Sequence, residues 1–212
     1  MRLTLRQTGH NDIYKVALCY RKAFPKSLAS AFGTSYVVQM LTWFLSTDHN
    51  FLFHLEEEGQ GTVIGFCGGL INDGVHPRGS ASEMIQYAFL EGIRSLVKKP
   101  WLIFHREMRS KYGLAFKNLR KKIVSPPLKN YVPGTVQPFC GLVVIGVNPD
   151  FQNRGVGNNL LLEFEMRSKA IGMPRMKLSV KSDNTQAIRS YEKNGWKKGE
   201  LRGSSLSMFK NI

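Results

Sequence analysis

Gln152-Asn153-Arg154-Gly155-Val156-Gly157 is the stretch that decides how this chain folds. It follows residues 142–147, a short apolar run rich in β-branched side chains that is closed by a proline and predicts a buried strand. Glycines at 155 and 157 leave room for a ligand to approach the backbone, and successive N–H groups at a helix start attract an anion. The stretch therefore predicts a turn that binds a pyrophosphate between a strand and a helix.

The run after this turn predicts an amphipathic helix. Leu161, Phe164 and Ile171 recur on one helical face, and Gly172 and Pro174 are stop signals. Downstream, residues 175–180 alternate apolar and polar side chains and predict a second strand.

A second motif follows that strand. Ser182-Asp183-Asn184 predicts a helix start, and the helix carries Ala187, Ile188 and Tyr191 before Asn194-Gly195-Trp196 ends it. The ordered pair Gln152-x-x-Gly155-x-Gly157 and Asn184-x-x-Ala187-x-x-x-Tyr191-Glu192-Lys193-Asn194-Gly195-Trp196 resembles the GNAT superfamily of acyl-CoA-dependent N-acyltransferases. The close resemblance covers about residues 141–199.

The resemblance implies acetyl-CoA as cosubstrate, with the pantetheine arm in a V-shaped gap between the strands that carry Val147 and Val180. It implies backbone contacts to the pyrophosphate at the turn, main-chain contacts at the end of the preceding strand, and a side-chain contact at the later helix start. The implied cofactor-binding residues are Val147, Gln152, Asn153, Arg154, Gly155, Val156, Gly157, Asn158 and Asn184. No metal is expected from the spacing of the histidines.

Tyr191 matches the tyrosine that commonly protonates the departing CoA thiolate in the family, a step that benefits from a nearby weak acid. The alternative is a half-buried aromatic that only packs. Many relatives also carry a carboxylate general base in the strand before the turn, whereas this chain has Gly141-Leu142-Val143-Val144 there. The general base is therefore unassigned, and Asp73 and His76 in the loop after the third strand are candidates.

Composition favours one domain over residues 1–212. The chain has 212 residues, of which 42% are hydrophobic, enough for a substantial core. The start of the chain lacks a signal-peptide core, and no apolar run is long enough for a membrane span, so we expect a cytoplasmic protein. Cys19, Cys67 and Cys140 are expected to be buried and reduced, and the five histidines show no spacing typical of a zinc site.

The fold class predicted is α/β, a GNAT-like mixed and mostly antiparallel sheet flanked by helices. Patterning predicts a first strand, a helix, a second helical stretch, a hairpin and two closing strands besides the elements above. These elements are Arg2–Gln7, a helix to about Phe24, Leu28–Leu45, the strands Phe51–Glu56 and Thr62–Ile71, and strands near 197–199 and 204–209.

Between the third and fourth strands lies a predicted helical insertion, about residues 75–138. One stretch places Ile85, Phe89, Ile93 and Leu96 on a face, and another, after Pro100, does so with Trp101, Phe104, Met108, Tyr112 and Leu119. Residues 94–129 hold eleven Lys or Arg and one acid, Glu107, which is ten of the net charge of +15.

A solvated helix face is the ordinary explanation of such a run of basic residues. The functional alternatives are attraction of an anionic small substrate, contact with an acidic membrane and contact with nucleic acid. A hairpin brings the end of the third strand beside the start of the fourth, whereas the pyrophosphate turn lies at the other end of the fourth strand. We therefore expect the insertion to border the side of the site where the amine acceptor binds. It also resembles, more weakly, that of bacterial GNAT proteins of surface-polysaccharide synthesis.

The function expected is direct acetyl transfer to an amine, that of an anionic amino sugar, nucleotide-linked or lipid-linked, in surface glycan synthesis. A lipid-linked acceptor would imply peripheral contact with an anionic inner membrane face. A protein or peptide amine is the first alternative. A non-catalytic module that binds CoA or nucleic acid is the second, and nucleic acid is the least favoured partner.

Overall fold

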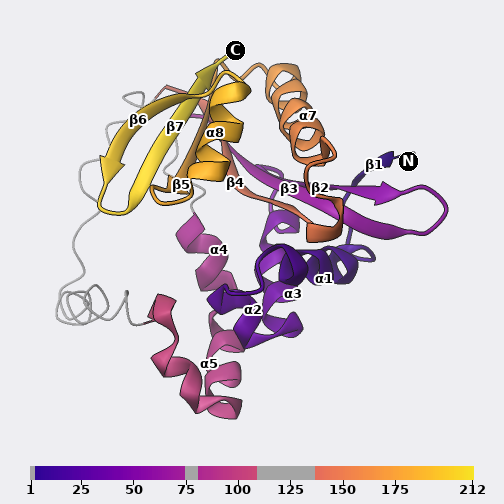
Figure 1. Cartoon of the computed structure of the whole chain (residues 1–212), viewed down its shortest axis with the longest axis vertical. Coiled ribbons are helices and arrows are strands. Elements are labelled where there is room, and N and C mark those ends of the chain that lie inside the picture. Colours follow the sequence, from indigo (N-terminus) through magenta and orange to yellow (C-terminus); the bar gives the residue numbers. More distant parts are fainter. Residues whose placement is uncertain (1–2, 75–80, 109–136) are drawn as a thin grey trace.

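A computed structural model describes residues 3–74, 81–108 and 137–212 of the chain. Its centre is one seven-stranded sheet in the order β1-β2-β3-β4-β5-β7-β6 (Figure 1). Every neighbouring pair is antiparallel except β4 and β5, which are parallel. The strands are β1 Leu3–Gln7, β2 Asn50–Glu57, β3 Thr62–Asn72, β4 Phe139–Val147, β5 Arg175–Lys181, β6 Lys197–Arg202 and β7 Ser205–Asn211. The predicted mixed, mostly antiparallel α/β fold is confirmed.

Helices cover both faces of the sheet. The first group packs on one face, the last two helices pack on the other, and the helices between β3 and β4 extend beyond the sheet (Figure 1). The α-helices are α1 Ile13–Ala23, α2 Leu28–Phe32, α3 Thr34–Thr42, α4 Ala81–Tyr87, α5 Phe89–Lys98, α7 Val156–Ala170 and α8 Thr185–Lys193, and the 3-10 helices are η1 Trp43–Leu45, η2 Pro100–Phe104 and η3 Pro149–Phe151.

Two apolar clusters hold these layers together. One cluster lies between the sheet and the helices α1 and α3 and includes the buried side chains of Val16, Val37 and Phe44. The other lies under α7 and α8 and includes the buried side chains of Leu160 and Phe164. Aromatic rings lie directly against the sheet because β3 has glycines beneath them. A Cβ at Gly68 would meet the Phe44 ring at 2.6 Å, and one at Gly69 would meet Phe51 at 2.4 Å.

Three local expectations need correction. The helical stretch from Leu28 to Leu45 is broken at Gly33, whose φ of 113° no helix accommodates, so α2 and α3 are separate helices. Ile171 does not share the buried face of Leu161 and Phe164, because it caps the end of α7 and is 42% exposed. The run after Pro100 starts as the 3-10 helix η2.

The described part of the insertion is helical, as predicted, and it leaves several large apolar side chains exposed. Phe89, Ile93, Trp101 and Phe104 are all exposed, while Leu102 is buried. The predicted positions from 109 to 136, among them Tyr112 and Leu119, lie outside the described residues, as does His76. None of the helices within the described ranges combines the length and the apolar character that crossing a bilayer requires.

Candidate active site

The parallel strands β4 and β5 separate part-way along their length. They pair at only three positions, Cys140 with Met176, Gly141 with Lys177 and Leu142 with Leu178, although both strands continue for several residues. On the other side of β4, Gly68 of β3 pairs with Val144 and Gly69 pairs with Leu142, so Val143 is an extra residue. Such a bulge bends a strand. Beyond residue 142, the side of β4 that faces β5 is therefore free of ladder hydrogen bonds to that strand, as a V-shaped gap requires.

The predicted turn lies at the open end of β4. The Gln152 side-chain amide donates a hydrogen bond to the Val147 carbonyl at 3.2 Å, and Asn148 caps η3 by accepting from the Asp150 N–H at 3.3 Å. These two contacts fix the turn to the end of the strand. Gln152 thus has a positioning role in this structure, since its amide is already used within the protein.

The turn itself has the backbone conformation of an anion site. Asn153 has a φ of 60° and Gly155 a φ of 80°, and Gly155 is the residue before the first turn of α7. No side chain caps this helix start, so the N–H groups of its first turn, at Val156, Gly157 and Asn158, point away from the helix without acceptors from the helix itself. A Cβ at Gly157 would lie 3.8 Å from the Val147 side chain, which places Gly157 against the end of β4.

Asn184 and Tyr191 lie at the N-cap and within the last turns of α8. The Asn184 side-chain oxygen accepts the Ala187 N–H at 3.2 Å and caps the helix, as its position predicted, and the Asn184 side chain is exposed. Tyr191 is buried against Trp196, with ring centroids 5.9 Å apart. Burial raises the pKa of Tyr191 well above its ordinary value of 10.0, so the hydroxyl stays protonated at neutral pH and is able to donate a proton.

A protein-family model matches this region of the sequence. The model of the acetyltransferase (GNAT) family matches residues 128–196, which include β4, the turn, α7, β5 and α8. Over these residues the chain is similar to the GNAT family.

Curated acetyltransferases resemble a segment of this chain, and solved acetyltransferases resemble its fold. An acetyltransferase of Pectobacterium atrosepticum is 43% identical over 49 residues, which are 23% of this chain and 35% of that protein. The chain thus spans about a third of the length of that relative. Similar structures include the PaiA N-acetyltransferase of Thermoplasma acidophilum in complex with coenzyme A, with a TM-score of 0.59, 15% identity and full coverage of both chains. Another is AAC(6')-Iy in complex with the bisubstrate analogue CoA-S-monomethyl-acetylneamine, with a TM-score of 0.58, 14% identity and 95% coverage of each chain.

A carboxylate that the sequence patterns did not assign to the candidate site lies at the end of β5. Glu107, the single acid of the basic window, accepts the Leu28 N–H at 3.0 Å and contacts the Lys181 ammonium at 3.2 Å. Burial raises the pKa of Glu107, but the Leu28 N–H and Lys181 outweigh it and leave the pKa below the ordinary value of 4.5. An ionised carboxylate from the insertion therefore joins the start of α2 to the end of β5. Asp73, a candidate general base from the sequence, directly follows the last residue of β3.

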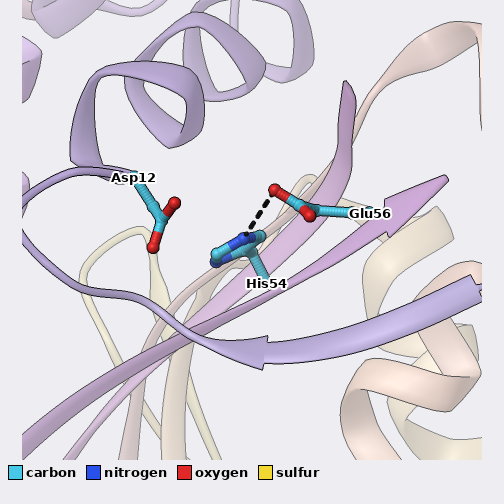
Figure 2. A group of neighbouring side chains, drawn as sticks. All are labelled: Asp12, His54 and Glu56. Atoms are coloured by element: carbon cyan, nitrogen blue, oxygen red, sulfur yellow. Dashed lines mark hydrogen bonds and ion pairs between the residues drawn. The ribbon is translucent and has the colours of Figure 1, made fainter. Parts of the chain in front are cut away.

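A separate polar cluster formed by Asp12, His54 and Glu56 lies between β1, β2 and the start of α1 (Figure 2). Histidine spacing along the sequence did not indicate it, but His54 and Glu56 are two residues apart on one face of β2. The Thr8 hydroxyl lies 2.8 Å from His54 Nδ1, and His54 Nε2 lies 3.3 Å from Glu56.

The atoms that would bind a metal in this cluster already have protein partners. The Glu56 carboxylate pairs with Arg6 at 2.9 Å, and Asp12 accepts the Gly9 N–H at 3.3 Å. Burial lowers the pKa of His54, so the ring is neutral at neutral pH. The cluster therefore acts as a polar tie between the first two strands and α1.

The three cysteines are buried and free, as predicted. Burial raises the pKa of Cys140 to about 11 and that of Cys19 to about 12. Both thiols are protonated at neutral pH, which disfavours an acyl-cysteine intermediate and leaves direct transfer as the simpler chemistry.

Proposed function

We propose that this protein is an acetyl-CoA-dependent N-acetyltransferase that transfers the acetyl group directly to the amine of an amino sugar. The observation that carries the proposal is the separation of β4 from β5 after Leu142 and Leu178, with an uncapped helix start at the open end of β4. The match to the GNAT family model over the same residues supports it.

In this proposal, the pyrophosphate of acetyl-CoA accepts hydrogen bonds from the backbone N–H groups at residues 153–158, where the helix start contributes a positive pole. Arg154 is exposed beside the turn and adds a cation. The pantetheine lies along the unpaired side of β4 up to Val147, and the Asn184 side-chain amide supports it.

The chemical step needs a neutral amine, an oxyanion donor and an acid. The amine nitrogen attacks the thioester carbonyl, and backbone N–H groups of β4 near Val147 stabilise the oxyanion. As the intermediate collapses, the C–S bond breaks and the Tyr191 hydroxyl gives its proton to the sulfur. The proton of the amine passes to Asp73, His76 or Glu107, directly or through water.

One observation favours an anionic acceptor and another favours an amino sugar. The basic window of the insertion joins β3 and β4 at the Asn72–Phe139 end of their ladder, opposite the turn. AAC(6')-Iy, whose structure is similar, is in complex with the bisubstrate analogue CoA-S-monomethyl-acetylneamine, and this supports an amino-sugar amine. For a lipid-linked acceptor, we propose cytoplasmic action with peripheral membrane contact, in which the exposed Phe89, Val97 and Trp101 meet the bilayer.

The test is turnover of acetyl-CoA with panels of amino sugars and peptide amines, in wild type and in Tyr191→Phe. We expect acetylation of an amino sugar, and a turnover in Tyr191→Phe that is lower by about one to two orders of magnitude with unchanged acetyl-CoA affinity. Turnover with peptide amines and not with amino sugars would show that the acceptor is a peptide or protein amine. Absence of both turnover and acetyl-CoA binding would refute the proposal.

A further inference from the structure

A hollow lies on the sheet face opposite α7 and α8. It has a volume of about 710 Å³ and is lined by parts of β4, β5, β6 and β7. Arg175, Lys177 and Ser179 of β5 line it. Because side chains alternate along a strand, these three point away from the core that Met176 and Leu178 enter under α7 and α8.

Two cations of this hollow rest on aromatic rings. The Arg175 guanidinium lies 4.0 Å from the centre of the Phe209 ring, and the Lys177 ammonium lies 4.3 Å from that of Phe139. Ring contacts of this kind orient a cation without neutralising it. At the rim, Arg202 pairs with Glu200 at 2.8 Å.

Arg175 and Lys177 have no carboxylate partner within residues 3–74, 81–108 and 137–212. Arg175 Nε is also buried without any hydrogen-bond partner. A buried donor without an acceptor is costly, and a ligand oxygen would satisfy it. Burial, and to a smaller extent the charge of Arg175, lower the pKa of Lys177.

The hollow reaches the point where β4 and β5 separate. Leu142 and Leu178, the last paired residues of β4 and β5, belong to its lining. Leu70 and Phe139, at the end where the insertion begins and returns, belong to it as well. A ligand held at Arg175 and Lys177 would therefore extend toward the opening between the strands from the side opposite α7.

We infer that this hollow binds the acceptor, and that the acceptor is an amino sugar carrying a phosphate that Arg175 and Lys177 hold. A guanidinium fork and an ammonium suit phosphate oxygens, and the apolar floor of Leu70, Phe139 and Phe209 suits the carbon face of a sugar. The inference rests on the proposed function, for which it supplies the substrate class and the residues that select it.

The kinetic experiment compares glucosamine with glucosamine 1-phosphate, which differ only in the phosphate. Lys177→Met and Arg175→Met each remove one cation, and Lys197→Met removes an exposed β6 cation outside the lining as a matched control. Loss of one charge-assisted hydrogen bond should raise the KM for glucosamine 1-phosphate about tenfold or more. The KM values for glucosamine and for acetyl-CoA should not change, and Lys177→Arg should retain most of the phosphate preference.

A third acceptor, UDP-glucosamine, distinguishes a sugar phosphate from a nucleotide-linked sugar. A lower KM for UDP-glucosamine than for glucosamine 1-phosphate in wild type, lost in both variants, would assign the pyrophosphate to Arg175 and Lys177. Equal KM values for glucosamine and both phosphorylated acceptors in wild type would overturn the inference. An equal rise for charged and uncharged acceptors in the variants would also overturn it, because it would indicate a distorted fold.

Binding without turnover separates this inference from the proposed function. Calorimetry with glucosamine 1-phosphate alone, without acetyl-CoA, should give a dissociation constant that is about tenfold or more weaker in Lys177→Met than in wild type and in Lys197→Met. If no amine is acetylated but this difference is found, the hollow is an anion site and the catalytic proposal fails. If glucosamine is acetylated but glucosamine 1-phosphate does not bind, the phosphate inference fails and the catalytic proposal stands.

Discussion

Gly155 and Gly172 provide a matched pair of substitutions that separates ligand contact from backbone strain. Gly155 has a φ of 80° and Gly172 a φ of 70°, and a Cβ built on either glycine has no atom within 4 Å. Valine at either position would therefore meet no clash and would suffer mainly from the left-handed backbone. That conformation costs an L-residue roughly 1–2 kcal/mol, and a β-branched one no less. Both variants should lose the same stability.

Their effects on CoA should differ. Gly155 precedes the uncapped start of α7 at the proposed pyrophosphate site, whereas Gly172 follows the opposite end of the same helix. A side chain at 155 occupies the space through which the phosphate oxygens approach the backbone. Losing one charge-assisted hydrogen bond costs about 1.5–3 kcal/mol, which is about a 10- to 100-fold weaker dissociation constant.

The assay is isothermal titration calorimetry with acetyl-CoA on wild type, Gly155→Val and Gly172→Val, with thermal unfolding in parallel. For a chain of this size, the strain should lower Tm by about 2–8 °C in both variants. Only Gly155→Val should bind acetyl-CoA more weakly. If both variants are folded and bind like wild type, the pyrophosphate lies elsewhere; if both weaken equally, strain rather than contact explains the loss.

Three further results follow from the described contacts. Because burial outweighs the attraction of Glu56 and keeps the pKa of His54 below 6.5, the unfolded chain binds more protons than the native one, so the free energy of unfolding should fall as pH drops below about 6.5. His54→Gln should flatten this dependence in denaturant titrations at several pH values, and an unchanged slope would exclude His54 as its source. Glu107→Gln should cost less than about 1 kcal/mol in unfolding free energy, since the pair with Lys181 is partly exposed, and a much larger loss would mean that this contact holds the insertion in place. Asp73→Asn should lower kcat with little change in the KM for acetyl-CoA if Asp73 accepts the amine proton, whereas an unchanged kcat would assign that role to another group.

Local sequence patterns determined most elements of this fold. The alternation in residues 175–180 predicted β5 with Met176, Leu178 and Val180 inward, and the structure confirms all three as buried. Asn184 was predicted at a helix start and caps α8. Such features are readable because each depends on neighbours within a few residues, through side-chain period and the donors of one helix turn.

Contacts between distant segments could not be read in this way. The insertion was predicted as helical and basic, but its single acid gave no sign that it would meet the start of α2 and the end of β5. His54 showed no ligand spacing, because its partners Thr8 and Asp12 come from another part of the chain.

The candidate site divides along the same line. The sequence by itself determined the turn at residues 152–157 and the helix with Asn184 and Tyr191, because each is a continuous segment with its own local signal. Only the tertiary structure decided where β4 leaves β5, and that Arg175 and Lys177 line one hollow with no carboxylate partner of their own among the described residues. Strand pairing and cation surroundings depend on which segments become neighbours when the sheet assembles, and no local periodicity encodes that choice.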